Sequence, residues 1–255
     1  MITEIFEDSI NYTFKDLKTF IKVGIISLFS FLIIPAFLLL GYSYRVTDTG
    51  LKGVMINSKD NLPKISPIAT LLKEGLGVFL VIFVYSLPSI ILSILIFSNT
   101  GLFNIAGNHL NFTITLNTGT FFLVSLLIIW FISFTLLTIA IPHMVENNDL
   151  KSAFKIKDLI KLINSFGIYG YIKFYIITIL LIIISIIVTF FISQGIINII
   201  TYLALFLTQN PLSGLIVTYL NIIVFIFLEL MFVIPFFLIS LSRAISFIYD
   251  PTELE

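Results

Sequence analysis

The segment IIPAFLLLGYSYRVTDTGLKGVMINSKDNLPKISPIATLLKEG, residues 33–75, decides the class of fold. It begins inside a strongly apolar run that ends near Gly41, and the chain becomes apolar again at Leu76. Between these two points lie five basic residues: Arg45, Lys52, Lys59, Lys64 and Lys73. Apolar runs that alternate with basic segments are typical of a protein that passes through a lipid bilayer.

The composition also indicates a membrane protein. Of the 255 residues, 58% are hydrophobic and 11% are charged, and the mean hydropathy is +1.12. Soluble domains carry about 25% charged residues, so a water-soluble fold of this composition would lack polar surface. The net charge is zero, which gives no overall field that would attract nucleic acid. The chain has no cysteine, which excludes disulfides, thiolate nucleophiles and cysteine metal sites.

Five apolar runs are each long enough to cross a bilayer as one helix. They are residues 23–44, 76–97, 119–142, 174–192 and 215–241. A shorter run, residues 196–207, follows Gln194 and Gly195, and we expect it to lie at the interface or to re-enter the membrane. The sequence predicts an all-α, polytopic integral membrane helix bundle that forms a single domain over residues 1–255. It has five spans, or six hydrophobic helices with the short run.

Residues 1–22 are predicted to form an amphipathic N-terminal helix. Hydrophobic residues recur in it at helical spacing, and most of its charged residues fall on the other side. Two interpretations stay open: the helix lies in the membrane interface, or it packs on its transmembrane neighbours. We do not expect a signal peptide, because Glu4, Glu7 and Asp8 make the start acidic and the apolar run begins late.

A short basic amphipathic piece precedes an apolar run three times, at residues 13–24, 62–75 and 153–167. In the third piece an apolar stripe runs along one side of the predicted helix. The stripe is Ile156, Leu159, Ile160, Ile163 and Phe166. The candidate lipid-headgroup contacts of this piece are Lys155, Lys157 and Lys161. These lysines either bind anionic lipid or merely anchor the cytoplasmic ends of the spans.

The distribution of basic residues predicts the orientation of the chain in the membrane. Segments 45–75 and 143–173 carry five basic residues each, whereas loops 98–118 and 193–214 carry no charge. We therefore expect the two basic segments and the C-terminal end to face the cytoplasm of the cell, and the neutral loops to face outward.

Three lysines before the first run, Lys15, Lys18 and Lys22, conflict with this orientation. If residues 23–44 cross once, these lysines lie outside. Either the N-terminus is external, or the run enters and returns as a hairpin broken at Pro35, whose turn protein would have to cover because lipid cannot pair its backbone. The length of the run favours the single crossing.

Glu229 is the sharpest candidate for chemistry because it lies in the middle of the last apolar run. A carboxylate at that depth costs about 2.5–3.5 kcal/mol on insertion scales, so it is paired, protonated or in contact with water. It is either an ion- or proton-coupled site of a transporter or an acid that hydrogen-bonds a neighbouring helix. Three other polar residues belong to the candidate intramembrane site and either line a cavity or bond between helices: Asn221, Gln194 and Asn198.

No metal, cofactor or catalytic site is predicted. His143 and Glu146 share a helix face, but two potential ligands are too few for a metal site, and a capped helix end or a surface pair is expected. The other histidine, His109, and the sequon at Asn111 fall in a predicted outer loop, so no intramembrane HExxH motif exists. No set of nucleophile, base and orienting group can be assembled, so we do not expect an enzyme.

A series of short motifs, strongest over residues 20–95, carries a family resemblance. The motifs are Ile33-Ile34-Pro35, Gly41-Tyr42, Arg45-Val46, Gly53, Asn61-Leu62-Pro63, Leu72-Lys73-Glu74-Gly75 and Tyr85-Ser86-Leu87-Pro88, with Ala153-Phe154 and Tyr169-Gly170-Tyr171 further on. Together they resemble the domain-of-unknown-function 4013 family of multi-span membrane proteins from archaea and bacteria. The resemblance implies a prokaryotic membrane location. It carries over no catalytic residue, since the family has no assigned activity.

Three functional classes compete on these grounds. The first is a non-enzymatic membrane component that binds lipids, membrane protein partners or a second copy of itself, and it is favoured by the repeated amphipathic pieces and the absence of catalytic motifs. The second is a small-solute or ion-coupled transporter or permease that uses Glu229. The third, an intramembrane enzyme, has the least support.

Overall fold

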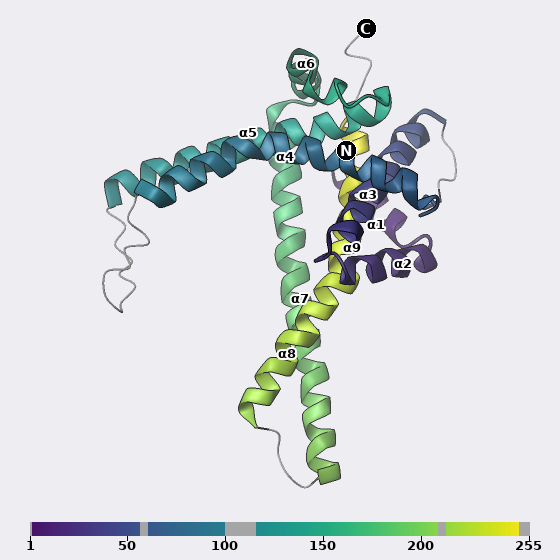
Figure 1. Ribbon diagram of the computed structural model, residues 1–255, viewed down its shortest axis with the longest axis vertical. Helices are drawn as coiled ribbons and strands as arrows, with labels where there is room; N and C mark the ends of the chain where they lie inside the picture. The colour runs from purple at the N-terminus through teal and green to yellow at the C-terminus, as the bar shows by residue number, and fades with distance from the viewer. Residues whose placement is uncertain (1, 57–60, 100–115, 209–212, 250–255) are drawn as a thin grey trace. The chain divides into compact units, whose positions relative to one another are not determined.

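The computed structural model describes residues 2–56, 61–99, 116–208 and 213–249, and these segments are almost entirely helical, with no strand among them (Figure 1). The sequon at Asn111 and His109 lie outside the described residues. The chain forms two compact units. Unit 1 comprises Met1–Leu76 and Phe166–Ile248, and unit 2 comprises Gly77–Ser165 and Tyr249–Glu255. Each unit is described by itself.

Unit 1 begins with two short helices, α1 (Ile2–Thr13) and α2 (Leu17–Leu28), where the sequence predicts one amphipathic helix over residues 1–22. The side chain of Asp16 separates them. It caps α2 by accepting hydrogen bonds from the backbone N–H groups of Lys18 and Thr19, at 3.0 and 3.3 Å. Aspartate at this position pairs backbone donors that have no partner within the helix, so a new helix begins there.

The first apolar run does not form one helix. The chain turns after α2 and enters α3 (Ile33–Ile56), so the prediction that residues 23–44 cross the membrane as a single helix is wrong. Short-range backbone hydrogen bonds close the turn. Pro35 lies in the first turn of α3, where its missing N–H is not needed and its fixed φ suits a helix start. Proline therefore starts the second helix rather than kinking a long one.

Together α2 and α3 form a helical hairpin in unit 1. One hydrophobic core lies at the base of the hairpin. It is made by buried side chains of α1, α2, α3, α9, the start of α4 (Ile68–Asn99) and the chain before α4: Tyr12, Phe20, Val23, Leu39, Tyr42, Val46, Leu62, Leu71 and Ile239. The tip of the hairpin is apolar and exposed. It consists of Phe29, Phe31, Leu32, Ile33 and Ile34, of which Phe31 is 77% exposed. Such a tip is compatible with a lipid environment rather than with water.

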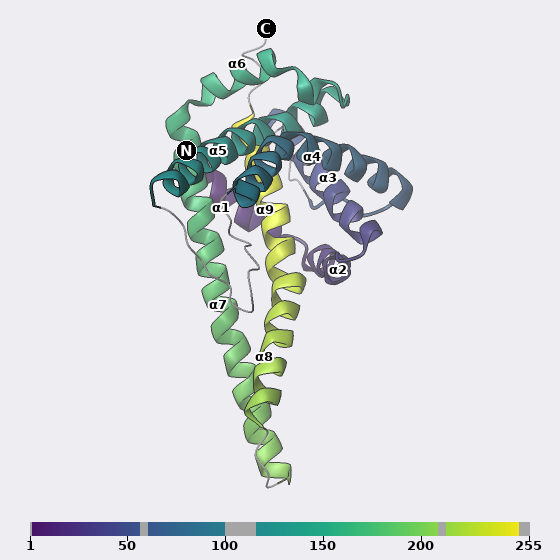
Figure 2. The same ribbon diagram turned by 60° about the vertical axis from the view of Figure 1, so that its left-hand side comes forward.

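A single long helix, α7 (Ile168–Thr208), contains both the run 174–192 and the short run 196–207. The prediction of a separate interfacial piece after Gln194 and Gly195 is therefore wrong. A glycine inside a helix costs about 1 kcal/mol, whereas a helix break in lipid leaves several backbone groups unpaired at several kcal/mol each. Continuation of the helix is the favourable outcome, and α7 lies beside α8 along its length (Figure 2).

The last apolar run lies in three joined helical segments: α8 (Gly214–Leu228), a π-helical turn η2 (Glu229–Val233) and α9 (Ile234–Ile248). The N–H of Ile234 bonds to the carbonyl of Glu229, five residues earlier, which is the π-helical pattern. Pro235 follows directly and has no N–H for the carbonyl of Met231. Gly24 of α2 packs on that carbonyl, and a Cβ at Gly24 would overlap it.

Helices α3 and α4 (Ile68–Asn99) approach each other through a reciprocal pair of glycines. A Cβ on Gly41 would overlap the carbonyl of Leu71, and a Cβ on Gly75 would overlap the carbonyl of Phe37. Each glycine therefore faces the backbone of the other helix. In lipid, where apolar side chains gain little by associating, such close backbone contact is a main source of helix–helix stability.

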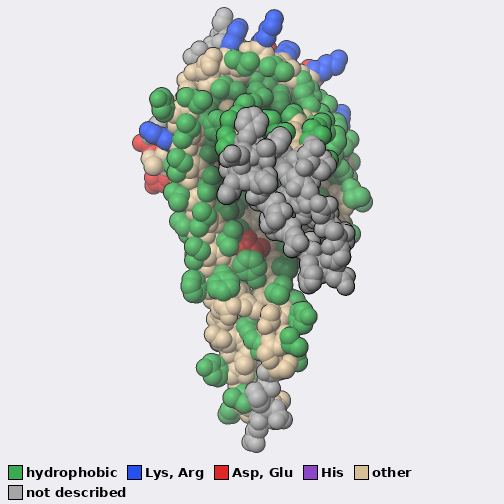
Figure 3. All heavy atoms as spheres, turned by 90° about the vertical axis from the view of Figure 1, so that its left-hand side faces the viewer, with side chains coloured by type: hydrophobic (Ala, Val, Ile, Leu, Met, Phe, Trp, Pro, Cys, Tyr) green, Lys and Arg blue, Asp and Glu red, His purple; other side chains and the backbone are tan. Residues whose placement is uncertain are grey.

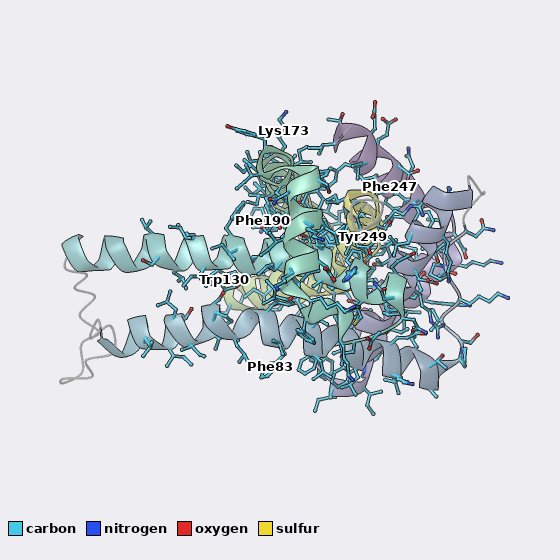
Figure 4. The ribbon with its side chains drawn as sticks, turned by 90° about the horizontal axis from the view of Figure 1, so that it is seen from above. Phe83, Trp130, Lys173, Phe190, Phe247 and Tyr249 are labelled. Carbon is cyan, nitrogen blue, oxygen red and sulfur yellow. The ribbon has the colours of Figure 1, made fainter. Side chains whose placement is uncertain are left out.

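Unit 2 consists of the remainder of α4 with α5 (Leu116–Asn147), a 3₁₀ turn η1 (Ser152–Phe154) and α6 (Ile156–Phe166). In this unit α4 and α5 lie side by side, with Phe83 on α4 and Trp130 on α5 (Figure 4). The Ser89 and Ser133 hydroxyls are 3.3 Å apart across the pair. The Tyr85 hydroxyl donates to the carbonyl of Ala153 at 2.6 Å, which fixes η1 against α4.

Four helical stretches are long and apolar enough to cross a membrane: Ile68–Leu95, Val124–Asn147, Ile168–Thr208 and Gly214–Ile248. Many of the described side chains in the view of Figure 3 are hydrophobic. Four of the five predicted spans thus overlap these stretches, and the fifth, residues 23–44, forms the α2–α3 hairpin instead. The described residues are helical, and the four apolar helices are compatible with a multi-pass membrane protein.

We predict that Gly75→Ala destabilises the protein by about 1–3 kcal/mol, because the new methyl group forces α3 and α4 apart. Thermal unfolding in detergent, followed by circular dichroism, measures the effect. Gly195→Ala is the matched control, since a Cβ at Gly195 meets no atom within 4 Å. Equal melting temperatures for the two variants would contradict the reciprocal glycine contact.

Candidate functional site

Glu229 lies in the π-helical turn at the centre of the last candidate span. Its carboxyl group faces the hydroxyl of Thr189 on α7. The Oε1 atom is buried and has no hydrogen-bond partner among the described residues. On α2, which packs against η2, the hydroxyl of Ser27 is likewise buried without a partner. A buried carboxyl oxygen with a threonine of α7 beside the group is thus present where the sequence predicts an intramembrane carboxylate.

The other residues predicted for the intramembrane site are distributed along α7 and α8. Gln194 and Asn221 are half-buried, and Asn198 is exposed. Near Gln194 and Asn198 on α7, the small hydroxyl residues Thr189 and Ser193 are buried. No hydrogen bond joins Glu229 to Asn221, Gln194 or Asn198 in the described residues, so this set of four remains a prediction. Thr189 is the neighbour of Glu229 that sequence reasoning missed, because small hydroxyl residues are common in spans and carry no charge.

Arg45 is the most highly bonded side chain of unit 1, since all five of its N–H groups donate hydrogen bonds. Nε donates to Oε2 of Glu74 at 2.7 Å in a partly buried ion pair. The other four N–H groups bind the chain that leads into α4, at 2.7–3.3 Å: the carbonyls of Lys64, Ser66 and Pro67, and the hydroxyl of Thr70. Arginine is the side chain that carries five N–H donors in a planar fork, and it can therefore donate to all these acceptors at once.

A second arginine, Arg243, holds the end of α9 against α1. Its side chain is buried, with Nε 3.2 Å from Oδ2 of Asp8. Its guanidinium lies over the rings of Tyr12 and Phe247, at 4.6 and 4.9 Å from their centroids. Cation–π contacts and the ion pair together offset the cost of burying this charge. The sequence indicates Arg243 only as an orientation signal, because Asp8 and Tyr12 lie more than 200 residues away in the chain.

Several contacts bring the N-terminal helices, the chain after α3 and the end of α9 to one end of unit 1. The Tyr12 hydroxyl donates to the carbonyl of Asn61 at 3.1 Å, next to the Arg243–Asp8 pair. Lys22 and Lys64, which lie before and after the first apolar run, line one groove. A bilayer cannot separate two side chains of one groove. Of the two interpretations of residues 23–44, the hairpin agrees with the structure, although it turns at residues 29–32 rather than at Pro35.

The basic helix of unit 2, α6, forms over nearly the range that the sequence predicts. The buried residues are Leu159 and Leu162, whereas Ile156 and Ile160 of the predicted apolar stripe are 55% and 49% exposed. Helix α6 therefore buries only part of its apolar surface. The three lysines that the sequence singles out are exposed, and no ion pair to them occurs among the described residues: Lys155, Lys157 and Lys161.

His143 does not pair with Glu146, which is exposed. Its Nδ1 lies 2.9 Å from the hydroxyl of Tyr249, and both residues are buried in unit 2. Burial raises the pKa of the Tyr249 phenol, so the phenol is neutral and can donate to the imidazole. The Ser152 hydroxyl donates to the His143 carbonyl at 3.0 Å. This cluster joins α5, η1 and the C-terminal end, and the described residues contain no cluster of metal ligands.

We predict that Arg45→Lys lowers the stability of the protein, because an ammonium group has three donors and cannot reach five acceptors. The matched control is Lys52→Ala, which removes an exposed pair with Asp48 and should cost no more than about 1 kcal/mol. Melting in detergent and protease cleavage near residue 64 report the two effects. If both variants melt together and resist cleavage equally, Arg45 is not needed to hold this segment.

Comparison with known proteins agrees with the motifs that meet at this end of unit 1. The family model described as "Protein of unknown function (DUF4013)" matches residues 28–194, which is more than half of the chain. No curated protein and no solved structure gives a significant match. Arg45, Glu74 and Asn61, which make the contacts described above, all lie within the matched range. The chain belongs to the DUF4013 family.

Proposed function

We propose that the protein is a non-enzymatic component of a prokaryotic cell membrane that binds lipids or partner proteins at its basic, cytoplasmic end. The observation that carries this proposal is the surface of α6. Exposed isoleucines, Ile156 and Ile160, lie on the same short helix as exposed lysines that have no acidic partner among the described residues. A helix with this pairing rests in the headgroup region, where its apolar side chains enter the acyl boundary.

The electrostatic contribution of α6 depends on the lipid. Each lysine near an anionic membrane surface contributes about 1 kcal/mol, and Lys155, Lys157 and Lys161 lie within two turns of one another. Three such charges together with the two isoleucines suffice for a stable surface contact. An anionic partner protein would use the same surface, which is why the proposal includes both kinds of ligand.

Four crossings and one hairpin give a consistent orientation. In this arrangement the N-terminal helices, residues 45–75, residues 143–173 and the end of α9 are all cytoplasmic. The lysines before the hairpin, including Lys22, then lie on the same side as Lys64, as the positive-inside rule requires. The single-crossing alternative left this conflict unresolved. The short turn of the hairpin is closed by its own backbone hydrogen bonds, which an apolar environment demands.

A single cysteine tests the proposal, since the natural chain has none. We introduce Ile160→Cys, label it with an environment-sensitive fluorophore and place the full chain in phosphatidylcholine vesicles with or without phosphatidylglycerol. We expect a blue shift that is larger in the anionic vesicles. Lys155, Lys157 and Lys161 changed together to Gln should abolish the difference, while the equally charged control with Lys18, Lys52 and Lys73 changed to Gln should keep it.

The same cysteine reports the orientation. In intact cells a membrane-impermeant maleimide should not label Ile160→Cys, which we expect to face the cytoplasm. The same reagent should label Ile105→Cys, which we expect to face outward. Emission that is identical in both kinds of vesicle would remove the lipid contact, and labelling at 160 from outside would reverse the topology.

A second candidate function, an ion-coupled transporter, is favoured by one observation. Oε1 of Glu229 is buried without a partner in the described residues, at a π-helical turn of a membrane span. Turns of this kind occur often at functional sites, and an intramembrane carboxylate is by default a candidate for ion or proton binding. The hydroxyl of Thr189 would supply a further oxygen beside a cation or a proton held by Glu229.

We predict for this second candidate that Glu229→Gln reduces proton or cation flux in proteoliposomes at least tenfold, because the amide cannot take up and release a proton. A pH-sensitive dye trapped in the vesicles measures the flux. Thr218→Val on the preceding helix is the control and should transport normally, because this exposed hydroxyl bonds only the carbonyl of Gly214 in its own helix among the described residues. Flux that is equal in the natural protein and in Glu229→Gln would assign the carboxylate a purely structural role.

A further inference from the structure

A groove of about 620 Å³ lies in unit 1 between α2 and the chain that leads into α4. Lys22 of α2 and Lys64 line it from opposite sides. The apolar residues that line it are Ile25, Ile26, Ile65 and Ile68. The groove therefore combines two positive charges with an apolar wall, and it contains no carboxylate. This combination matches a ligand that has an anionic group and a hydrocarbon part.

The two lysines are available to a ligand. Asp16, which interacts electrostatically with Lys22, uses its oxygens to cap α2 through the N–H groups of Lys18 and Thr19 and the Thr19 hydroxyl. On the other side, Arg45 holds the carbonyl of Lys64 at 2.7 Å. The backbone of Lys64 is thus fixed while its ammonium group remains exposed and forms no ion pair in the described residues.

The apolar wall continues from the groove toward the tip of the hairpin. Ile26 and Ile65 pack against the core, whereas Ile25 and Ile68 are 47% and 58% exposed. Phe29, one turn after Ile25, is half-exposed and begins the apolar tip. An acyl chain that leaves the groove along α2 therefore meets only hydrocarbon, and at the other end of the groove the lysines mark the level of the headgroups.

We propose that this groove binds an anionic phospholipid, with the phosphate between Lys22 and Lys64 and an acyl chain along Ile25 toward the hairpin tip. The proposal rests on the proposed membrane function but concerns a separate site from α6. A free phosphate would satisfy the lysines and leave the isoleucines exposed to water. An acidic peptide would place polar backbone against the apolar wall, at a cost in unpaired hydrogen bonds. A phospholipid matches both halves of the groove.

The test uses the full chain in vesicles and one fluorescent reporter. Trp130 is the single natural tryptophan, so Trp130→Phe with Ile25→Trp places the reporter in the groove. Lipids with brominated acyl chains quench tryptophan on contact. We expect brominated phosphatidylglycerol to quench more strongly than brominated phosphatidylcholine, with a preference of about fivefold for each lysine. Lys22→Gln with Lys64→Gln should remove this preference.

The control variant, Lys18→Gln with Lys52→Gln, removes two charges from the same end of unit 1 without touching the groove, and it should keep the preference. If both double variants lose it, the attraction comes from general surface charge and the groove is not a site. If neither variant changes it, the lysines do not bind the phosphate. Soluble glycerol phosphate should leave the quenching unchanged, and displacement by it would assign the site to a free phosphate.

A second measurement does not depend on the inserted tryptophan. Native mass spectrometry of the otherwise unchanged protein should find phosphatidylglycerol retained through detergent purification, and the Lys22→Gln, Lys64→Gln protein should retain at least tenfold less. The α6 experiment separates the two proposals. A shift at residue 160 without retained lipid overturns the groove alone, and retained lipid without that shift overturns the role of α6 alone.

Discussion

The guanidinium of Arg45 holds α3, the start of α4 and the chain between these helices together in unit 1. Three of its five hydrogen bonds fasten the extended chain before α4 to the middle of α3, and the other two bind Thr70 and Glu74 at the start of α4. At the edge of a bilayer the carbonyls of such a segment must be paired within the protein. Because the segment is held there, Lys64 lines the same groove as Lys22, and Asn61 receives the hydrogen bond of Tyr12.

Close backbone contacts give the hairpin its place on the other helices of unit 1. Gly24 lies on the Met231 carbonyl at the π-helical turn, and Gly50 faces Ser246 of α9 with no room for a Cβ. The Thr47 hydroxyl donates to the Ser242 carbonyl at 3.3 Å on the same interface. In lipid, small residues let helices approach and gain dispersion energy, whereas larger ones would only exchange lipid contacts for protein contacts. Close packing thus adds to the hydrophobic core at the base of the hairpin.

Unit 1 contains polar groups that are paired, at its basic end, and polar groups that are buried without a partner in the described residues. At the basic end, Arg45 and Arg243 are satisfied by acids, carbonyls and aromatic rings, and they act as structural supports. In contrast, Oε1 of Glu229 in the last candidate span and the Ser27 hydroxyl on α2 are each buried with no partner in the described residues. Unpaired polar groups in a medium of low polarity are costly, which distinguishes these two buried atoms from the paired arginines.

The sequence by itself determined the membrane class, the helical content and four of the five predicted spans, because about 20 consecutive apolar residues have one stable solution in lipid. It also determined α6 and the depth of Glu229, which follow from spacing along a single helix. Only the tertiary structure decided that residues 23–44 fold back, that 196–207 continues α7 and that His143 meets Tyr249. These outcomes depend on backbone pairing and on partners distant in the chain: Asp16 and Pro35 start new helices, while Arg45 and Arg243 find acceptors that no local pattern indicates.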